Sequence, residues 1–213
     1  MTEVSTEAVP VGQDTTTLRG RLRAETARWH ERVEAVADVP GSIRSRDDYV
    51  ELLSRLYELH ACLEGHLAAP GFHDAWRSVG VDIAAHRRAS LLADDLVVLG
   101  ASAPTGSLSS VPFATFGHAL GGLYVLEGSS LGGRIVARLV RATLGDVPTT
   151  FLSGDGRSHP APWSSTCQAL ACFDARGGDG GAVVSGACDV FAAFADRLSP
   201  GGPSHTITMV APT

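Results

Sequence analysis

His30 is the residue of this 213-residue sequence whose type and position best suit ligand chemistry. It lies in the segment 17–37, where apolar residues recur at three- and four-residue spacing and predict an amphipathic helix. A neutral imidazole beside an apolar face can serve as an axial ligand for haem iron, and arginines on the same helix can bind carboxylates. A histidine with only a structural role is the alternative, and spacing alone does not exclude it.

A second unusual segment is 112–144, which has the apolar character of one long helix but contains six glycines. Each glycine inside a helix costs roughly 0.8–1 kcal/mol relative to alanine, so their presence needs a reason. At about 100° per residue, four of the six fall within about 60° of one another and form a glycine stripe without side chains. The stripe allows a flat ligand to approach the backbone, and it equally allows another helix to pack closely. Its members are Gly117, Gly121, Gly128 and Gly132, while Gly122 and Gly133 lie beside it.

The elements that would position these residues are helices. Thr15, Thr16 and Thr17 offer N-caps for the first helix, and Ser45 offers one for the second. No segment shows the period-2 alternation of a strand, so the predicted class is all-α, in one bundle-like domain. The domain is expected to span 16–199, after a disordered leader at 1–15 and before a flexible tail at 200–213. Further helices are predicted at 45–68, 72–79, 82–99, 163–176 and 182–198.

Composition narrows the functional classes. A formal net charge of −6 argues against non-specific nucleic-acid binding, and no apolar run is long enough to span a membrane. The four cysteines show neither CxxC nor zinc-finger spacing, and no signal peptide is recognisable, which favours reduced thiols and a cytoplasmic setting. The Glu-x-x-His pairs of di-iron bundles are missing. Of the other histidines, His73 and His86 are expected at the surface or in loops.

Four segments together resemble one family, the biliverdin-producing haem oxygenases, and in particular the bacterial branch associated with bacteriophytochromes. LRAETARWHERVEA at 22–35 resembles the family's proximal helix, and LYVLEGSSLGGRIVARLV at 123–140 resembles its distal helix. RRASLLADDLVVLG at 87–100 and FLSGDG with the following Trp163 resemble two further blocks. The resemblance extends over about 18–198, nearly all of the expected folded part.

The resemblance implies an all-α fold that holds haem between a proximal helix and a kinked distal helix. Haem would be both substrate and prosthetic group, with its iron as the reactive centre. Cleavage with O2 and external electrons would give biliverdin, Fe²⁺ and CO. A ferredoxin or a flavin reductase would supply the electrons, and a bacteriophytochrome is the expected acceptor of biliverdin. Neither nucleic acid nor a membrane is expected as a partner.

Residue roles follow from the resemblance by position. His30 matches the iron ligand, and Gly128, Gly132 and Gly133 match the glycines of the distal kink. Ser129 stands where mammalian members have an aspartate, so Ser129 or Ser130 with backbone amides is expected to hold the distal water. The residues expected to take part in catalysis are thus Gly128, Ser129 and Gly132.

The propionate side departs from the mammalian pattern, because the region 165–176 offers Gln168 and Cys172 in place of basic residues. Propionate binding is therefore expected from Arg23, two turns before His30, with Tyr124 and Arg134. Thr26 is expected to border the cofactor one turn before His30, Glu127 is expected to have a structural role, and a non-catalytic haem- or bilin-binding protein of the same fold is the alternative function.

Overall fold

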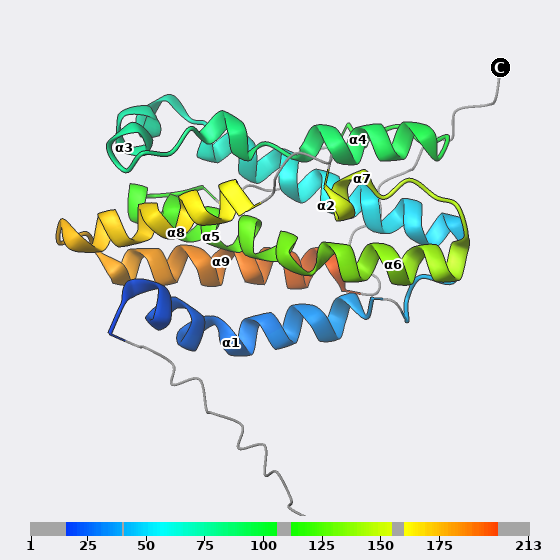
Figure 1. Ribbon diagram of the computed structural model, residues 1–213, viewed down its shortest axis with the longest axis horizontal. Helices are drawn as coiled ribbons and strands as arrows, with labels where there is room; N and C mark the ends of the chain where they lie inside the picture. Colours follow the sequence, from blue (N-terminus) through cyan, green and yellow to red (C-terminus); the bar gives the residue numbers. More distant parts are fainter. Residues whose placement is uncertain (1–15, 40, 106–111, 155–159, 200–213) are drawn as a thin grey trace, which may run out of the picture.

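The computed structural model describes residues 16–39, 41–105, 112–154 and 160–199, and these residues form helices without a β-strand (Figure 1). The all-α class predicted from the sequence is confirmed. The predicted leader at 1–15 and tail at 200–213 lie outside the described residues. In chain order the α-helices are α1 (Leu18–Ala37), α2 (Arg46–Leu67), α3 (His73–Ser78), α4 (Ala89–Val98), α5 (Phe116–Ser129), α6 (Gly133–Leu144), α7 (Thr150–Ser153), α8 (Pro160–Ala175) and α9 (Gly180–Leu198). Short 3-10 helices are η1 (Pro70–Phe72), η2 (Ile83–His86) and η3 (Ser130–Gly132).

Side-chain caps determine where the first two helices begin. The Thr17 hydroxyl accepts the N–H of Gly20 at 3.1 Å, which starts α1. Ser45 and Asp48 form a capping box at the start of α2, in which each side chain accepts the backbone N–H of the other residue. Both starts were predicted from the sequence, because the capping signal is local.

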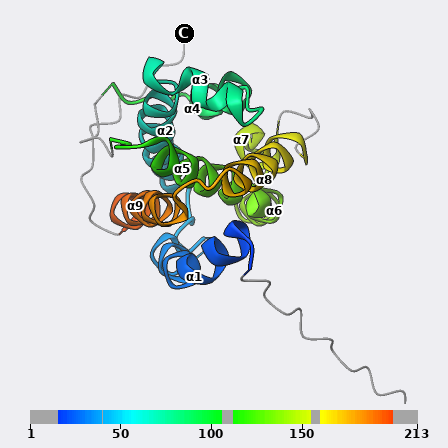
Figure 2. The ribbon, with the colours of Figure 1, turned by 90° about the vertical axis from the view of Figure 1, so that its left-hand side faces the viewer.

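The helices pack in layers around α5 and α9 (Figures 1 and 2). α9 packs along both α5 and α1, while α2 packs on α4 and α6 on α7. The two views agree that α1 lies on one side of the molecule, beneath α9 and α6, and that α2, α3 and α4 lie on the opposite side. α1, which carries His30, is therefore the outermost helix on its side of the fold.

The buried apolar residues form two clusters. The first joins α1, α5, α8 and α9 with the second half of α2. The second joins the first half of α2 with α4, α6 and α7. Leu126 belongs to the first cluster and Val140 to the second, so the chain passes from one to the other where α5 gives way to α6.

The prediction of a single helix at 82–99 was wrong, because η2 and α4 replace it. The interruption lies at Arg87 and Arg88, where the Glu64 carboxylate of α2 accepts the backbone N–H groups of Arg88 at 2.9 Å and Ala89 at 3.0 Å. A carboxylate at this place caps the new helix. The cap comes from another helix, so the local sequence gives no sign of the break.

The segment 112–144 is likewise not one helix. α5 begins after its N-cap Thr115, and η3 separates it from α6. At this junction the hydroxyl groups of Ser129 and Ser130 donate to the carbonyls of Leu126 and Glu127, each at 2.7 Å. These bonds satisfy carbonyl groups at the end of α5. The break lies at the glycine-rich place where the resemblance implied a kink.

Candidate functional site

His30 projects from α1 with its side chain 59% exposed. Its Nδ1 lies 3.5 Å from Glu34 Oε2, and its ring meets the edge of Phe191 at a centroid distance of 6.1 Å. Within the described part of the chain, Nε2 of His30 has no hydrogen-bond partner. An imidazole with Nδ1 near a carboxylate and Nε2 open has the arrangement of an axial ligand to iron.

Thr26, one turn before His30, is only 3% exposed. Its hydroxyl donates to the Leu22 carbonyl at 2.8 Å, inside α1 itself. The helix therefore accounts for the threonine without a ligand, and the function proposed below gives Thr26 no polar contact with one.

Arg23 and Tyr124, which the sequence assigned to propionate binding, lie near one another although they belong to α1 and α5. Burial raises the pKa of the Tyr124 hydroxyl, and the positive charges of Arg19 and Arg23 offset part of this increase. Arg19 was not considered in the sequence analysis, although it lies one turn before Arg23 on the same face of α1. Neither arginine has an ion-pair partner among the described residues. Two unpaired guanidinium groups beside a neutral phenol form a suitable site for carboxylates.

The glycine stripe has two parts with different surroundings. A Cβ atom on Gly121 would lie on the backbone carbonyl of Val183 in α9, and one on Gly117 would meet the Ala182 side chain of α9 at a tight 3.2 Å. Off the stripe, the ring of Phe113 occupies the space over Gly122, where a Cβ would meet it at 2.6 Å. The first half of the stripe thus serves helix packing, which was one of its two interpretations.

The second half of the stripe faces a different environment. A Cβ on Gly132 would meet no atom within 4 Å, and one on Gly128 would meet the Trp163 ring at an ordinary 3.6 Å. Gly133 differs, because its Cβ would lie on the carbonyl oxygen of Leu152 in α7. Packing therefore accounts for Gly133, whereas Gly132 borders open space beside the kink and Gly128 borders only the edge of an indole.

η3 and α6 continue this surface with apolar side chains. Leu131 is 59% exposed, Ile135 57% and Leu139 39%, at four-residue spacing, and we refer to these three residues as the apolar stripe. Ile135 and Leu139 share the side of the helix on which Gly132 lies. Arg134 is exposed about 200° around the helix from Gly132, so it is not assigned to the ligand below. Large exposed apolar side chains that follow one another indicate a surface that binds something.

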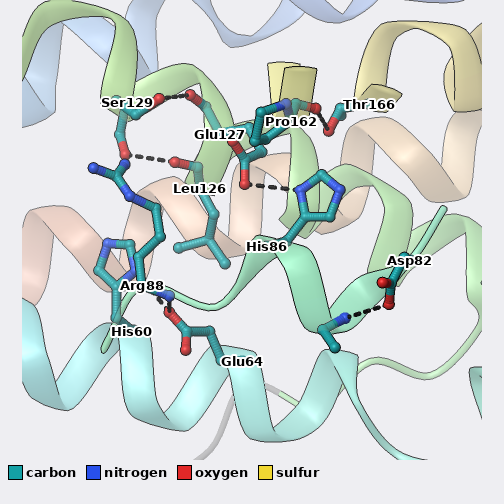
Figure 3. A network of polar contacts seen from close by, with 12 residues as sticks. His60, Glu64, Asp82, His86, Arg88, Leu126, Glu127, Ser129, Pro162 and Thr166 are labelled. Atoms are coloured by element: carbon teal, nitrogen blue, oxygen red, sulfur yellow. Dashed lines mark hydrogen bonds and ion pairs between the residues drawn. The ribbon is translucent and has the colours of Figure 1, made fainter. Parts of the chain in front are cut away.

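Glu127, directly before the distal glycines, is not available as an acid for chemistry in the open space. It is 3% exposed, and its Oε1 lies 2.9 Å from Nδ1 of His86, which is also buried (Figure 3). The expectation of a structural role for Glu127 is confirmed. The expectation that His86 lies at the surface was wrong, since its partner is 41 residues away and leaves no local signal.

A second buried group lies beside this pair (Figure 3). His60 Nδ1 lies 3.2 Å from Glu64 Oε1, the same oxygen that caps α4, and Arg88 stacks over the Phe151 ring with 4.6 Å between its Cζ and the ring centroid. These side chains connect α2, α4 and α7 behind the kink. These contacts stabilise the scaffold.

Glu127→Gln is expected to fold and to keep the activity proposed below, because an amide oxygen can still accept a hydrogen bond from His86. Glu127→Ala should lose about 3 kcal/mol of unfolding free energy, since it leaves a buried partner without a hydrogen bond. Urea denaturation measures the unfolding free energy of both variants, and an assay of the proposed haem turnover measures their activity. A folded but inactive Glu127→Gln would show that the carboxyl group itself takes part in the chemistry.

The residues of α1 and of the α5–α6 junction fit a flat, amphiphilic, iron-containing ligand. His30 offers one open imidazole nitrogen, Gly132 offers bare backbone, and Ile135 with Leu139 offers an apolar wall. Arg19 and Arg23 can bind acidic substituents at one end of such a ligand. Among the described residues, no three His, Cys, Asp or Glu side chains come together in a way that could hold a metal ion. A single histidine that ligates an already chelated iron agrees with that donor set.

The thiols and the helix lengths add two plain facts. All four cysteines lie in the described part of the chain, and none of them is in a disulfide. In that same part no helix has the length and apolar character that crossing a membrane requires.

Comparisons with known proteins point in the same direction as the site. No protein-family model matches the chain. A haem oxygenase from Xanthomonas campestris pv. campestris (strain 8004) is 36% identical over 97 residues, which are 45% of this chain and 54% of that protein. The chain thus spans about half the length of the curated relative it matches.

Two solved structures share the fold over most of the chain. The NO- and CO-bound haem oxygenase of Neisseria meningitidis aligns with a TM-score of 0.67 at 18% identity, over 85% of this chain and 90% of that one. A haem oxygenase of the cyanobacterium Synechocystis, in complex with haem, aligns with a TM-score of 0.63 at 20% identity over the same shares. At such low identity the likeness concerns the backbone, and the chain therefore has the haem oxygenase fold.

Proposed function

We propose that this protein is a haem oxygenase that cleaves haem to biliverdin, Fe²⁺ and CO with O2 and external electrons. The observation that carries the proposal is an exposed His30, with Nε2 open, on α1, the helix that lies beneath α6, before which the backbone at Gly132 is bare (Figures 1 and 2). The fold shared with the two solved haem oxygenases and the sequence match to the Xanthomonas protein support it.

The bound haem would supply the iron that activates O2 and the ring that is oxidised. His30 would bind the iron through Nε2, and Glu34 would orient the imidazole through Nδ1. Gly128 and Gly132 would let the distal backbone approach the ring, and Ile135 and Leu139 would exclude bulk water from it. Arg19, Arg23 and Tyr124 would hold the propionates and so fix the rotation of the ring in the pocket.

Ser129 is proposed to position water on the oxygen side. Its hydroxyl hydrogen is already donated to the Leu126 carbonyl, so the oxygen atom is left to accept a hydrogen bond from water. With Glu127 bonded to His86, no carboxylic acid of α5 competes for that place. Proton delivery is therefore assigned to ordered water and backbone groups rather than to a side-chain acid.

The decisive experiment adds haemin to the purified protein and then a reductant in air. We expect a Soret band typical of histidine-ligated haem, followed by its loss and the appearance of the broad red absorption of biliverdin. Chromatography of the bilin would identify its isomer, and the rotation fixed by Arg19 and Arg23 predicts one dominant isomer. Transfer of the bilin to an apo-bacteriophytochrome would test the expected acceptor.

A haem-binding protein without catalysis is the second candidate. The observation in its favour is the lack of a distal carboxylate, since Ser129 stands at that place and Glu127 is bonded elsewhere. In that case the Soret complex would form and survive reductant and O2 unchanged. That result would reject the oxygenase while retaining His30 as ligand.

A further inference from the structure

The solvent-facing side of α6 carries three exposed arginines, Arg134, Arg138 and Arg141, which we call the arginine stripe. None of them has an ion-pair partner among the described residues, and α6 contains no acidic residue. The chain as a whole carries a net charge of −6. On such an acidic protein, a row of unpaired cations gives this side of α6 a local positive field that attracts anionic partners.

The arginine stripe lies next to the apolar stripe, of which Ile135 and Leu139 are on the same helix. With about 100° per residue, the centres of the two stripes are roughly 90° apart around α6. Gly133, Ala137 and Val140 form the third side, which is buried against the rest of the protein. Each side of α6 thus has its own environment: the core, the proposed haem side and the solvent.

We propose that the arginine stripe is the docking surface for a small acidic electron-carrier protein. This inference rests on the proposed function, which consumes electrons that the chain itself does not hold. A carrier docked on the arginine stripe would be separated from the proposed haem side by little more than α6, a helix roughly 10 Å across. Charge complementarity would both attract the carrier and orient it on this helix.

An anionic membrane fits the same charges less well. The net charge of −6 repels such a surface as a whole. A helix that lies in a membrane must also bury its apolar side in the lipid. Here the apolar stripe is assigned to the haem, so the arginines alone would face the headgroups.

The test compares Arg138→Gln/Arg141→Gln with a matched control, Arg46→Gln/Arg87→Gln, which removes the same charge from exposed positions on other elements. The probe is a plant-type two-iron ferredoxin, kept reduced by its reductase and NADPH, and ascorbate is the small reductant. For the α6 variant at low salt we expect ferredoxin-driven haem turnover to fall about tenfold. Its ascorbate-driven turnover should equal that of the unmodified protein, and the control should match the unmodified protein in both assays.

Isothermal titration of ferredoxin into the haem-free and the haem-loaded protein measures docking independently of turnover. We expect the α6 variant to bind about tenfold more weakly, with a smaller dependence on salt. Equal binding by the variant and the unmodified protein would overturn the inference, as would an equal loss of ascorbate-driven turnover. If the unmodified protein sediments with phosphatidylserine vesicles and the α6 variant does not, the arginine stripe binds lipid instead, and the inference is overturned. If ascorbate produces no bilin at all, the proposed function fails, and the titration still decides the docking.

Discussion

His30→Ala is expected to abolish the histidine-ligated haem spectrum and to reduce turnover more than any other single substitution on α1. Nε2 of His30 has no hydrogen-bond partner among the described residues, and α1 contains no second histidine that could replace it. Loss of a hydrogen-bond partner of a metal ligand typically costs about 10–100-fold, and loss of the ligand itself should exceed that. Haemin titration followed by absorbance and turnover with ascorbate measures both effects.

Three comparisons make this result specific. The exposed His73→Ala in α3 should behave like the unmodified protein, because only the position on α1 matters. Glu34→Gln should bind haem with a smaller loss, since the amide can still orient the imidazole. Added imidazole should restore to His30→Ala a spectrum like that of the histidine-ligated haem. An unchanged Soret band in His30→Ala would remove His30 from the site.

Gly121→Ala is expected to destabilise the fold by about 3 kcal/mol or to prevent folding, because its Cβ would lie on the Val183 carbonyl of α9. A backbone oxygen of a buried helix cannot turn aside as a flexible side chain can. Urea denaturation followed by circular dichroism measures the change in unfolding free energy.

Gly65→Ala is the matched control, because Gly65 lies inside α2 and its Cβ would meet nothing within 4 Å. The usual advantage of alanine over glycine in a helix should then stabilise the protein by roughly 0.5–1 kcal/mol. The two substitutions add the same methyl group with opposite expected signs. Equal urea midpoints for Gly121→Ala and the unmodified protein would refute the close packing of α5 on α9.

The helices and their beginnings could be predicted from the sequence where the signals are local. Thr17 and Ser45 cap α1 and α2 from within a few residues, and the apolar periodicity follows directly from each segment. The break at Arg87 could not be predicted, because the cap comes from Glu64 on a different helix. The burial of His86 depends in the same way on Glu127.

In the candidate site too, contacts between distant elements could not be predicted from the sequence. A helical wheel places Gly121 and Gly132 on one stripe, yet one packs on α9 and the other borders open space. The wheel assumes a continuous helix, whereas η3 interrupts it between the two positions. Arg19 could not be assigned to the site from the sequence, because its charge acts on Tyr124 only when α1 and α5 come together.

Without bound haem, the apolar stripe at η3 and α6 leaves large apolar side chains exposed to solvent. Leu131, Ile135 and Leu139 are all more than one third exposed, so the empty protein presents a surface that favours self-association. A ligand that binds only the folded chain adds to its stability in proportion to the logarithm of its concentration. The supply of haem would then set how much of this protein persists in the cell, and abundance would follow substrate without any separate regulator.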